Sequence, residues 1–111
     1  MLTSYLCEEL DLETTNRLKQ QLTQLGCAST LQEIFWLPVP NRFLTPLQQE
    51  HSESCGPYSL PLEILPTSLC LELLVRASGA LHCHCIAPAS AELRAYALKE
   101  LDGILQSVME Q

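Results

Sequence analysis

Charge is scarce in this sequence of 111 residues, and positive charge is the scarcer kind. Charged residues make up 17% of the chain, below the usual quarter of a globular protein. Six Lys and Arg face thirteen Asp and Glu, which gives a formal net charge of −7, and no basic run occurs. Because basic side chains that neutralise phosphates supply most nucleic-acid affinity, we expect neither nucleic acid nor an anionic membrane surface as a partner.

Long hydrophobic runs are missing as well. No apolar stretch approaches the roughly 20 residues that span a bilayer, and the first nine residues lack the basic and apolar regions of a secretory signal. The apolar content of 47% is nevertheless enough for a hydrophobic core. We therefore expect one domain over 1–111, a cytoplasmic location and reduced thiols at all six cysteines.

The common signatures of reactions and ligands are absent. The four glycines form no phosphate-binding loop, which excludes the usual nucleotide-binding motifs. No C-x₂-C pair and no H-E-x-x-H run is present. Since no motif identifies a reaction, we favour a non-enzymatic protein.

What the chain does contain is regular hydrophobic periodicity. Asp11 can cap a helix over 12–25, and a second helix with a continuous apolar stripe is predicted over 90–109. A short helix is predicted from Thr45, the first residue of a capping-box sequence, to about Ser54. Strands are predicted over five segments: 2–7, 33–39, 58–65, 69–76 and 80–87.

This order of elements predicts an α+β two-layer sandwich. We expect an antiparallel sheet of about four to five strands, with the two long helices, 12–25 and 90–109, on one face. The nearest common arrangement is ferredoxin-like, and at most in part, because no strand follows the last helix.

The most informative stretch is His82-Cys83-His84-Cys85, whose four side chains can all bind metals. In a strand over 80–87, alternate side chains point to opposite faces, so the histidines and the cysteines separate into two pairs. The strand can follow 69–76 through either a two-residue or a three-residue loop. We prefer the three-residue loop 77–79, which places glycine at the left-handed position of the turn.

In that register the cysteines face the core and the histidines face Glu72. Val75 would lie opposite Leu81, and Glu72 opposite His84. Cys83 and Cys85 would then pack under the helices as small hydrophobic residues. His82, His84 and Glu72 would form a site for Zn²⁺ or another divalent metal. The alternative is an exposed strand face with a simple Glu–His pair.

Other reactive residues lie elsewhere in the sequence. His51 and Cys55 are spaced i, i+4 on the short helix, and Cys70 shares the predicted polar sheet face, so these three are further ligand candidates. Cys55 is a poor nucleophile because it ends a helix beside acidic residues, which raises a thiol pKa. Cys7 and Cys27 are expected to be ordinary core or surface thiols.

Trp36 and Arg42 belong to the one segment rich in large aromatic residues, and both are types that anchor protein interfaces. Filling the core is the other role open to the aromatic residues. Our first functional hypothesis is a small non-enzymatic module that binds itself or another protein through an open sheet face or edge. The second is a metal-binding protein or metalloenzyme that uses His82, His84 and Glu72.

Overall fold

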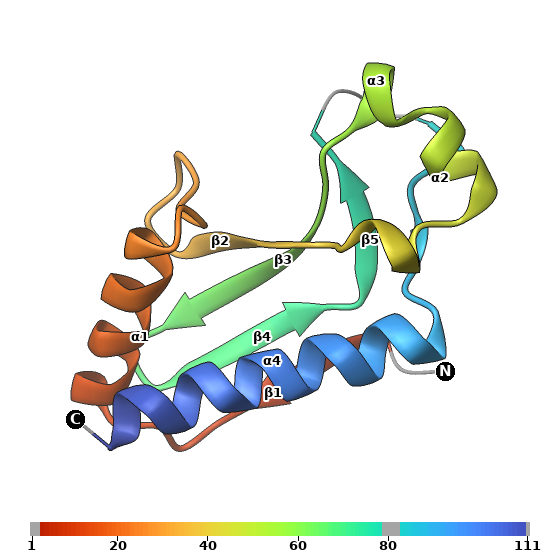
Figure 1. The fold of residues 1–111 in the computed structure, drawn as a ribbon. Coiled ribbons are helices and arrows are strands. Elements are labelled where there is room, and N and C mark those ends of the chain that lie inside the picture. The colour runs from red at the N-terminus through yellow and green to blue at the C-terminus, as the bar shows by residue number, and fades with distance from the viewer. Residues whose placement is uncertain (1–2, 79–82, 111) are drawn as a thin grey trace.

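The computed structural model describes residues 3–78 and 83–110, in which helices cover one face of an antiparallel sheet (Figure 1). The elements are, in chain order, β1 (Ser4–Cys7), α1 (Leu12–Gln24), β2 (Ile34–Pro38), the 3-10 helix η1 (Asn41–Phe43), α2 (Pro46–Glu50), α3 (Ser52–Cys55), β3 (Tyr58–Leu65), β4 (Ser68–Glu72), β5 (Leu74–Ala77), β6 (Ala87–Pro88) and α4 (Ala91–Met109). The predicted α+β class and its antiparallel sheet are confirmed. The partial ferredoxin-like arrangement stays a prediction.

The sheet is built around β3. On one side β3 pairs with β2, and on the other its start pairs with β5 and its end with β4. β1 pairs with the outer side of β4, and β6 pairs with β5. The predicted strand 69–76 is divided at Leu73, whose N–H donates to the Thr3 carbonyl (3.0 Å) and whose carbonyl accepts from the Ala89 N–H (2.9 Å).

The core lies between one face of this sheet and the two long helices. Alternate residues of β3 are buried, and Leu62 and Ile64 have no exposed surface. α1 contributes Leu18 and Leu22, also fully buried, and α4 contributes Leu101. Each such side chain stabilises the fold by about 1.5–3 kcal/mol relative to an exposed position. The expectation that both long helices cover one face is confirmed.

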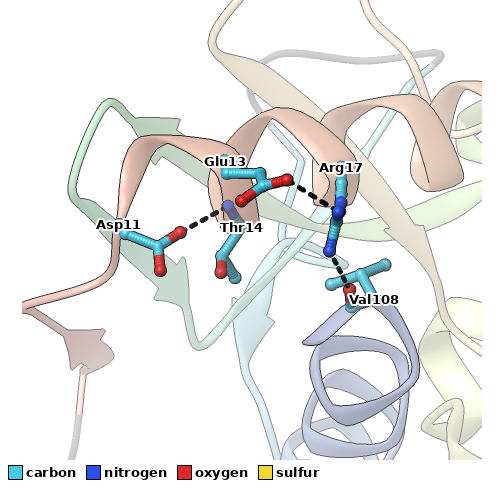
Figure 2. Close-up of polar contacts among 5 residues, drawn as sticks. All are labelled: Asp11, Glu13, Thr14, Arg17 and Val108. Atoms are coloured by element: carbon cyan, nitrogen blue, oxygen red, sulfur yellow. Dashed lines mark hydrogen bonds and ion pairs between the residues drawn. The ribbon is translucent and has the colours of Figure 1, made fainter. Parts of the chain in front are cut away.

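The start of α1 is capped as its sequence predicts. The Asp11 carboxylate accepts a hydrogen bond of 2.7 Å from the Thr14 N–H (Figure 2). One turn later, Arg17 forms an ion pair of 2.7 Å with Glu13 and donates a 3.4 Å hydrogen bond to the Val108 carbonyl. Val108 lies in the last turn of α4, where a cation complements the negative end of the helix dipole. Arg17 thereby links the two long helices.

The two short helices, α2 and α3, lie at the end of the molecule away from α1 (Figure 1). The capping box is present: Gln48 N–H donates to the Thr45 hydroxyl, and Thr45 N–H donates to the Gln48 side chain. The predicted single helix is divided at His51 into α2 and α3. Gly56 then lets the chain leave α3, because a Cβ there would lie 2.6 Å from the Ser52 carbonyl oxygen.

Candidate metal centre

The segment 83–86 is a tight turn, so the strand predicted over 80–87 is wrong for these residues. The Ile86 N–H donates a hydrogen bond of 3.0 Å to the Cys83 carbonyl. Pairing with β5 begins only at β6, where Val75 lies opposite Ala87 and not opposite Leu81. The predicted register is therefore wrong as well, and the loop glycine and His82 that it involved lie outside the described residues.

The contacts of Cys83 and Cys85 explain why this segment forms a turn. In an extended strand, the Cα atoms of residues 83 and 85 would lie roughly 6.5–7 Å apart. The turn instead brings both sulfurs into a group with His51 and Cys55, in which all ligand atoms lie within 4.8 Å of one another. Among the residues that the structure describes, this is the one group of three or more potential metal ligands with such proximity.

The distances within this group, which we call the Cys₃His cluster (His51, Cys55, Cys83 and Cys85), approach those of a tetrahedral site. The His51 Nδ1 atom lies 3.3 Å from Cys83 Sγ and 4.0 Å from Cys55 Sγ. Around a tetrahedral zinc ion, with Zn–N about 2.0–2.1 Å and Zn–S about 2.3 Å, nitrogen and sulfur ligands lie about 3.6 Å apart. The two measured distances bracket that value.

Two local structures present the four ligands. The break between α2 and α3 puts His51 at the junction, and Cys55 follows one helical turn later at the end of α3. Cys83 and Cys85 come from the turn that precedes β6. The sulfurs of Cys55 and Cys85 are buried, with residue exposures of 6% and 1%, whereas His51 and Cys83 are half-buried.

Gln48 joins the two structures beneath the cluster. Its side chain, 2% exposed, donates a 2.8 Å hydrogen bond from Nε2 to the Cys85 carbonyl. The main-chain carbonyl of Gln48 accepts hydrogen bonds from the Tyr58 hydroxyl (2.8 Å) and from the Ser52 hydroxyl (3.0 Å). Because each of these groups has a partner, the turn is held against α2 by a satisfied buried network. Outer hydrogen bonds of this kind orient metal ligands.

The electrostatics of the cysteines favour a bound cation. The pKa of the Cys83 thiol is lowered to about 6, first by a hydrogen bond from the Cys85 N–H to its sulfur and then by the Cys85 and His51 side chains. Burial raises the pKa of Cys85 to about 11. Cys83 therefore presents a thiolate near neutral pH, whereas Cys85 loses its proton there only when a metal compensates the charge.

The residues predicted as a metal site from the sequence are placed differently. The Glu72 carboxylate forms an ion pair of 2.8 Å with Arg76 on the sheet. His84 is exposed in the turn, and His82 lies outside the described residues. The site that combines His82, His84 and Glu72 stays a prediction, but the register that would set His84 opposite Glu72 is not the observed one.

The remaining candidates are distributed over the surface. Cys70 is half-buried in β4 and outside the Cys₃His cluster. Trp36, 36% exposed, lies opposite Pro61 on the uncovered face of the sheet. The Arg42 guanidinium stacks within the molecule, 4.7 Å from the centre of the Phe43 ring and 5.0 Å from that of Tyr96. An interface at Trp36 and Arg42 stays a prediction.

The sequence contains the four cluster residues as two close-spaced pairs. Spacing predicts His51 and Cys55 as a pair on one helix and Cys83 and Cys85 as a pair on one strand face, but it does not bring the two pairs together. Metal sites are commonly built from two close-spaced ligand pairs far apart in the chain, and H-x₃-C followed by C-x-C fits that pattern. The predicted core position is confirmed for Cys85, which is 1% exposed, and the half-buried Cys83 packs against the core, but from a turn and not from a strand.

Comparisons with protein-family models, curated proteins and solved structures found no match for this chain. Over the described ranges, no helix has both the length and the apolar character that crossing a membrane requires.

Proposed function

We propose that this protein is a metal-binding module in which the Cys₃His cluster binds one Zn²⁺ ion. The observation that supports this most strongly is the convergence of three thiols and one imidazole, from two separate segments, within 4.8 Å. Thiolates and imidazole are soft and borderline ligands that suit Zn²⁺, whereas Mg²⁺ and Ca²⁺ prefer oxygen.

The number of ligands favours a structural role for the ion. Catalytic zinc sites have three protein ligands and an open position for water or substrate, whereas four protein ligands close a tetrahedral sphere. Here the ion would connect the α2–α3 segment with the turn before β6, which Gln48 already links through one hydrogen bond. Binding energy at such a site contributes directly to folding. This agrees with the non-enzymatic protein that we favour from the sequence.

Elemental analysis of protein expressed without added metal tests the proposal. We expect about one zinc per chain in the wild type and none in the Cys55→Ser/Cys83→Ser variant. Cys70→Ser is the matched control, because it removes a half-buried thiol outside the cluster. Wild-type protein that is folded and reduced but takes up no zinc on titration would overturn the proposal. So would a folded double variant, checked by circular dichroism, that keeps its zinc.

Binding of a second copy or of another protein, which we expect from the sequence, is a separate proposal and concerns a different surface. The face of the sheet that the helices leave uncovered exposes Leu6 (57%) and Trp36 (36%). A module that binds a second copy or another protein would use this face. Light scattering at micromolar concentration tests self-association, and a monomer that retains no partner in a pull-down would count against both forms of this proposal.

A further inference from the structure

We propose, on the basis of the proposed zinc centre, that the Cys₃His cluster is also an oxidation site for hydroperoxides. A hydroperoxide would oxidise Cys83, and Cys83 would then form a disulfide with Cys55 and release the ion. Such oxidation would regulate the zinc centre. The arrangement of the three sulfurs supports this proposal.

The three cysteines differ in their access to a small oxidant. Cys83 is half-buried, whereas Cys55 and Cys85 have only 6% and 1% of their surface exposed. A small molecule from solvent therefore reaches the Cys83 sulfur before the other two. Oxidation of cysteine depends on such exposure and on thiolate character, and a thiolate is the form that binds zinc.

Cys55 is the better placed partner for an oxidised Cys83. The two residues come from separate segments, so their sulfurs can close from the observed range of up to 4.8 Å to a disulfide bond by a small movement of the turn. Cys85 is separated from Cys83 by one residue, and so short a ring strains the disulfide dihedral. Its carbonyl is also fixed by Gln48, and its sulfur lies beside the Tyr58 hydroxyl.

The chemistry balances with a hydroperoxide as the only oxidant. The Cys83 thiolate attacks the terminal oxygen of R–O–O–H, the O–O bond breaks, and the products are Cys83–S–OH and R–O⁻. The Cys55 thiolate then attacks the sulfenic sulfur and displaces hydroxide, which forms the disulfide. The two thiolates lose two electrons, and the peroxide gains them. Two protons from the buffer convert R–O⁻ and hydroxide into R–OH and H₂O.

The reaction removes two of the four ligands from the ion. His51 and Cys85 would remain, and two protein ligands do not complete the tetrahedral site that zinc requires. The ion is therefore released to solvent as the disulfide forms. The same two segments that zinc connected are then connected by the Cys55–Cys83 bond, so the oxidised protein keeps the link while losing the metal.

The experiment uses hydrogen peroxide on zinc-loaded full-length protein in the Cys70→Ser background. A chromogenic chelator measures zinc release, and mass spectrometry of a non-reduced tryptic digest maps the disulfide. We expect one zinc released per Cys55–Cys83 disulfide. A Cys83→His variant, which replaces the thiol by another zinc ligand, is expected to bind zinc and to release it at least about 10-fold more slowly.

The outcomes separate this inference from the proposed function. Protein that binds no zinc at the start contradicts the zinc centre itself. Protein that binds zinc but keeps it under peroxide, or forms a Cys83–Cys85 disulfide, overturns the oxidation site alone. Equally fast release from Cys83→His also overturns it. If that variant does not fold, the disulfide map of the protein that retains Cys83 decides the question.

Discussion

The six cysteines divide into two sets with different surroundings, although all six are free. Cys55, Cys83 and Cys85 meet His51 at one end of the molecule. The other three stand apart: Cys7 at the end of β1, Cys27 after α1 and Cys70 in β4. The chemistry of a thiol in this protein is therefore determined by its neighbours and not by its burial alone.

Cys27 and Cys83 show the difference most clearly. Burial raises the pKa of Cys27, and no neighbour compensates. The pKa of Cys83 is instead lowered to about 6 by the Cys85 N–H and the surrounding side chains. The first is a hydrophobic packing residue with a neutral thiol, whereas the second offers a thiolate to a cation.

Removal of one ligand from the cluster is expected to have the largest effect on zinc affinity. Cys85→Ser is expected to weaken zinc affinity more than about 100-fold, since even residues that only orient ligands contribute 10–100-fold. Cys70→Ser is expected to change affinity less than about 2-fold, because that thiol lies outside the cluster. Competition titration with a zinc indicator measures both, and equal losses would abolish the distinction between the two sets.

Removing the metal tests the same difference at the level of stability. With free zinc at 1,000 times its Kd, binding stabilises the folded state by about 4 kcal/mol. For a chain of this size, chelation should then lower Tm by roughly 10 °C or more. Differential scanning fluorimetry with and without chelator measures the shift. A chelator that lowers the Tm of Cys55→Ser/Cys83→Ser equally would show that the effect is unrelated to the cluster.

Gln48→Leu tests the network beneath the cluster while leaving all four ligands in place. The variant loses the hydrogen bond to the Cys85 carbonyl, and we expect zinc affinity to fall about 10–100-fold. Glu50→Ala is the control, because that side chain is exposed on the same helix. Calorimetric titration distinguishes the two, and unchanged affinity in Gln48→Leu would show that the turn needs no such support.

The pH dependence of alkylation sharpens the contrast between Cys83 and Cys27. In metal-free, reduced protein the lowered pKa of Cys83 means that its thiolate fraction rises through pH 6, whereas Cys27 stays protonated beyond pH 7. Iodoacetamide, followed by peptide mass spectrometry, should therefore modify Cys83 first at pH 7. At pH 5 its rate should drop about 10-fold, with the thiolate fraction. Equal rates at pH 7 would contradict the assigned environments.

The smallest effect is expected at His84, a residue of the metal site predicted from the sequence. His84 is exposed and outside the cluster, so His84→Ala should change zinc content by less than about 10%. Elemental analysis measures this directly. Loss of zinc in this variant would instead favour the site predicted from His82, His84 and Glu72.

Local patterns in the sequence predicted the elements that depend on local interactions. Asp11 marks the start of the first helix, and Thr45 with Gln48 marks the start of the second. The segment 83–86 was different because its flanking apolar residues favour a strand. Its turn depends on Gln48 and His51, which contact it from more than thirty positions earlier in the chain. Periodicity does not encode such long-range contacts, so the sequence predicts the two ligand pairs but not their proximity.

The direct test of the zinc centre is X-ray absorption spectroscopy at the zinc edge of the purified, reduced protein. We predict one zinc with three sulfur ligands at about 2.3 Å and one nitrogen ligand at about 2.0–2.1 Å. In Cys55→Ser/Cys83→Ser any residual zinc should show at most one sulfur. A wild-type spectrum with only nitrogen and oxygen ligands would contradict the account.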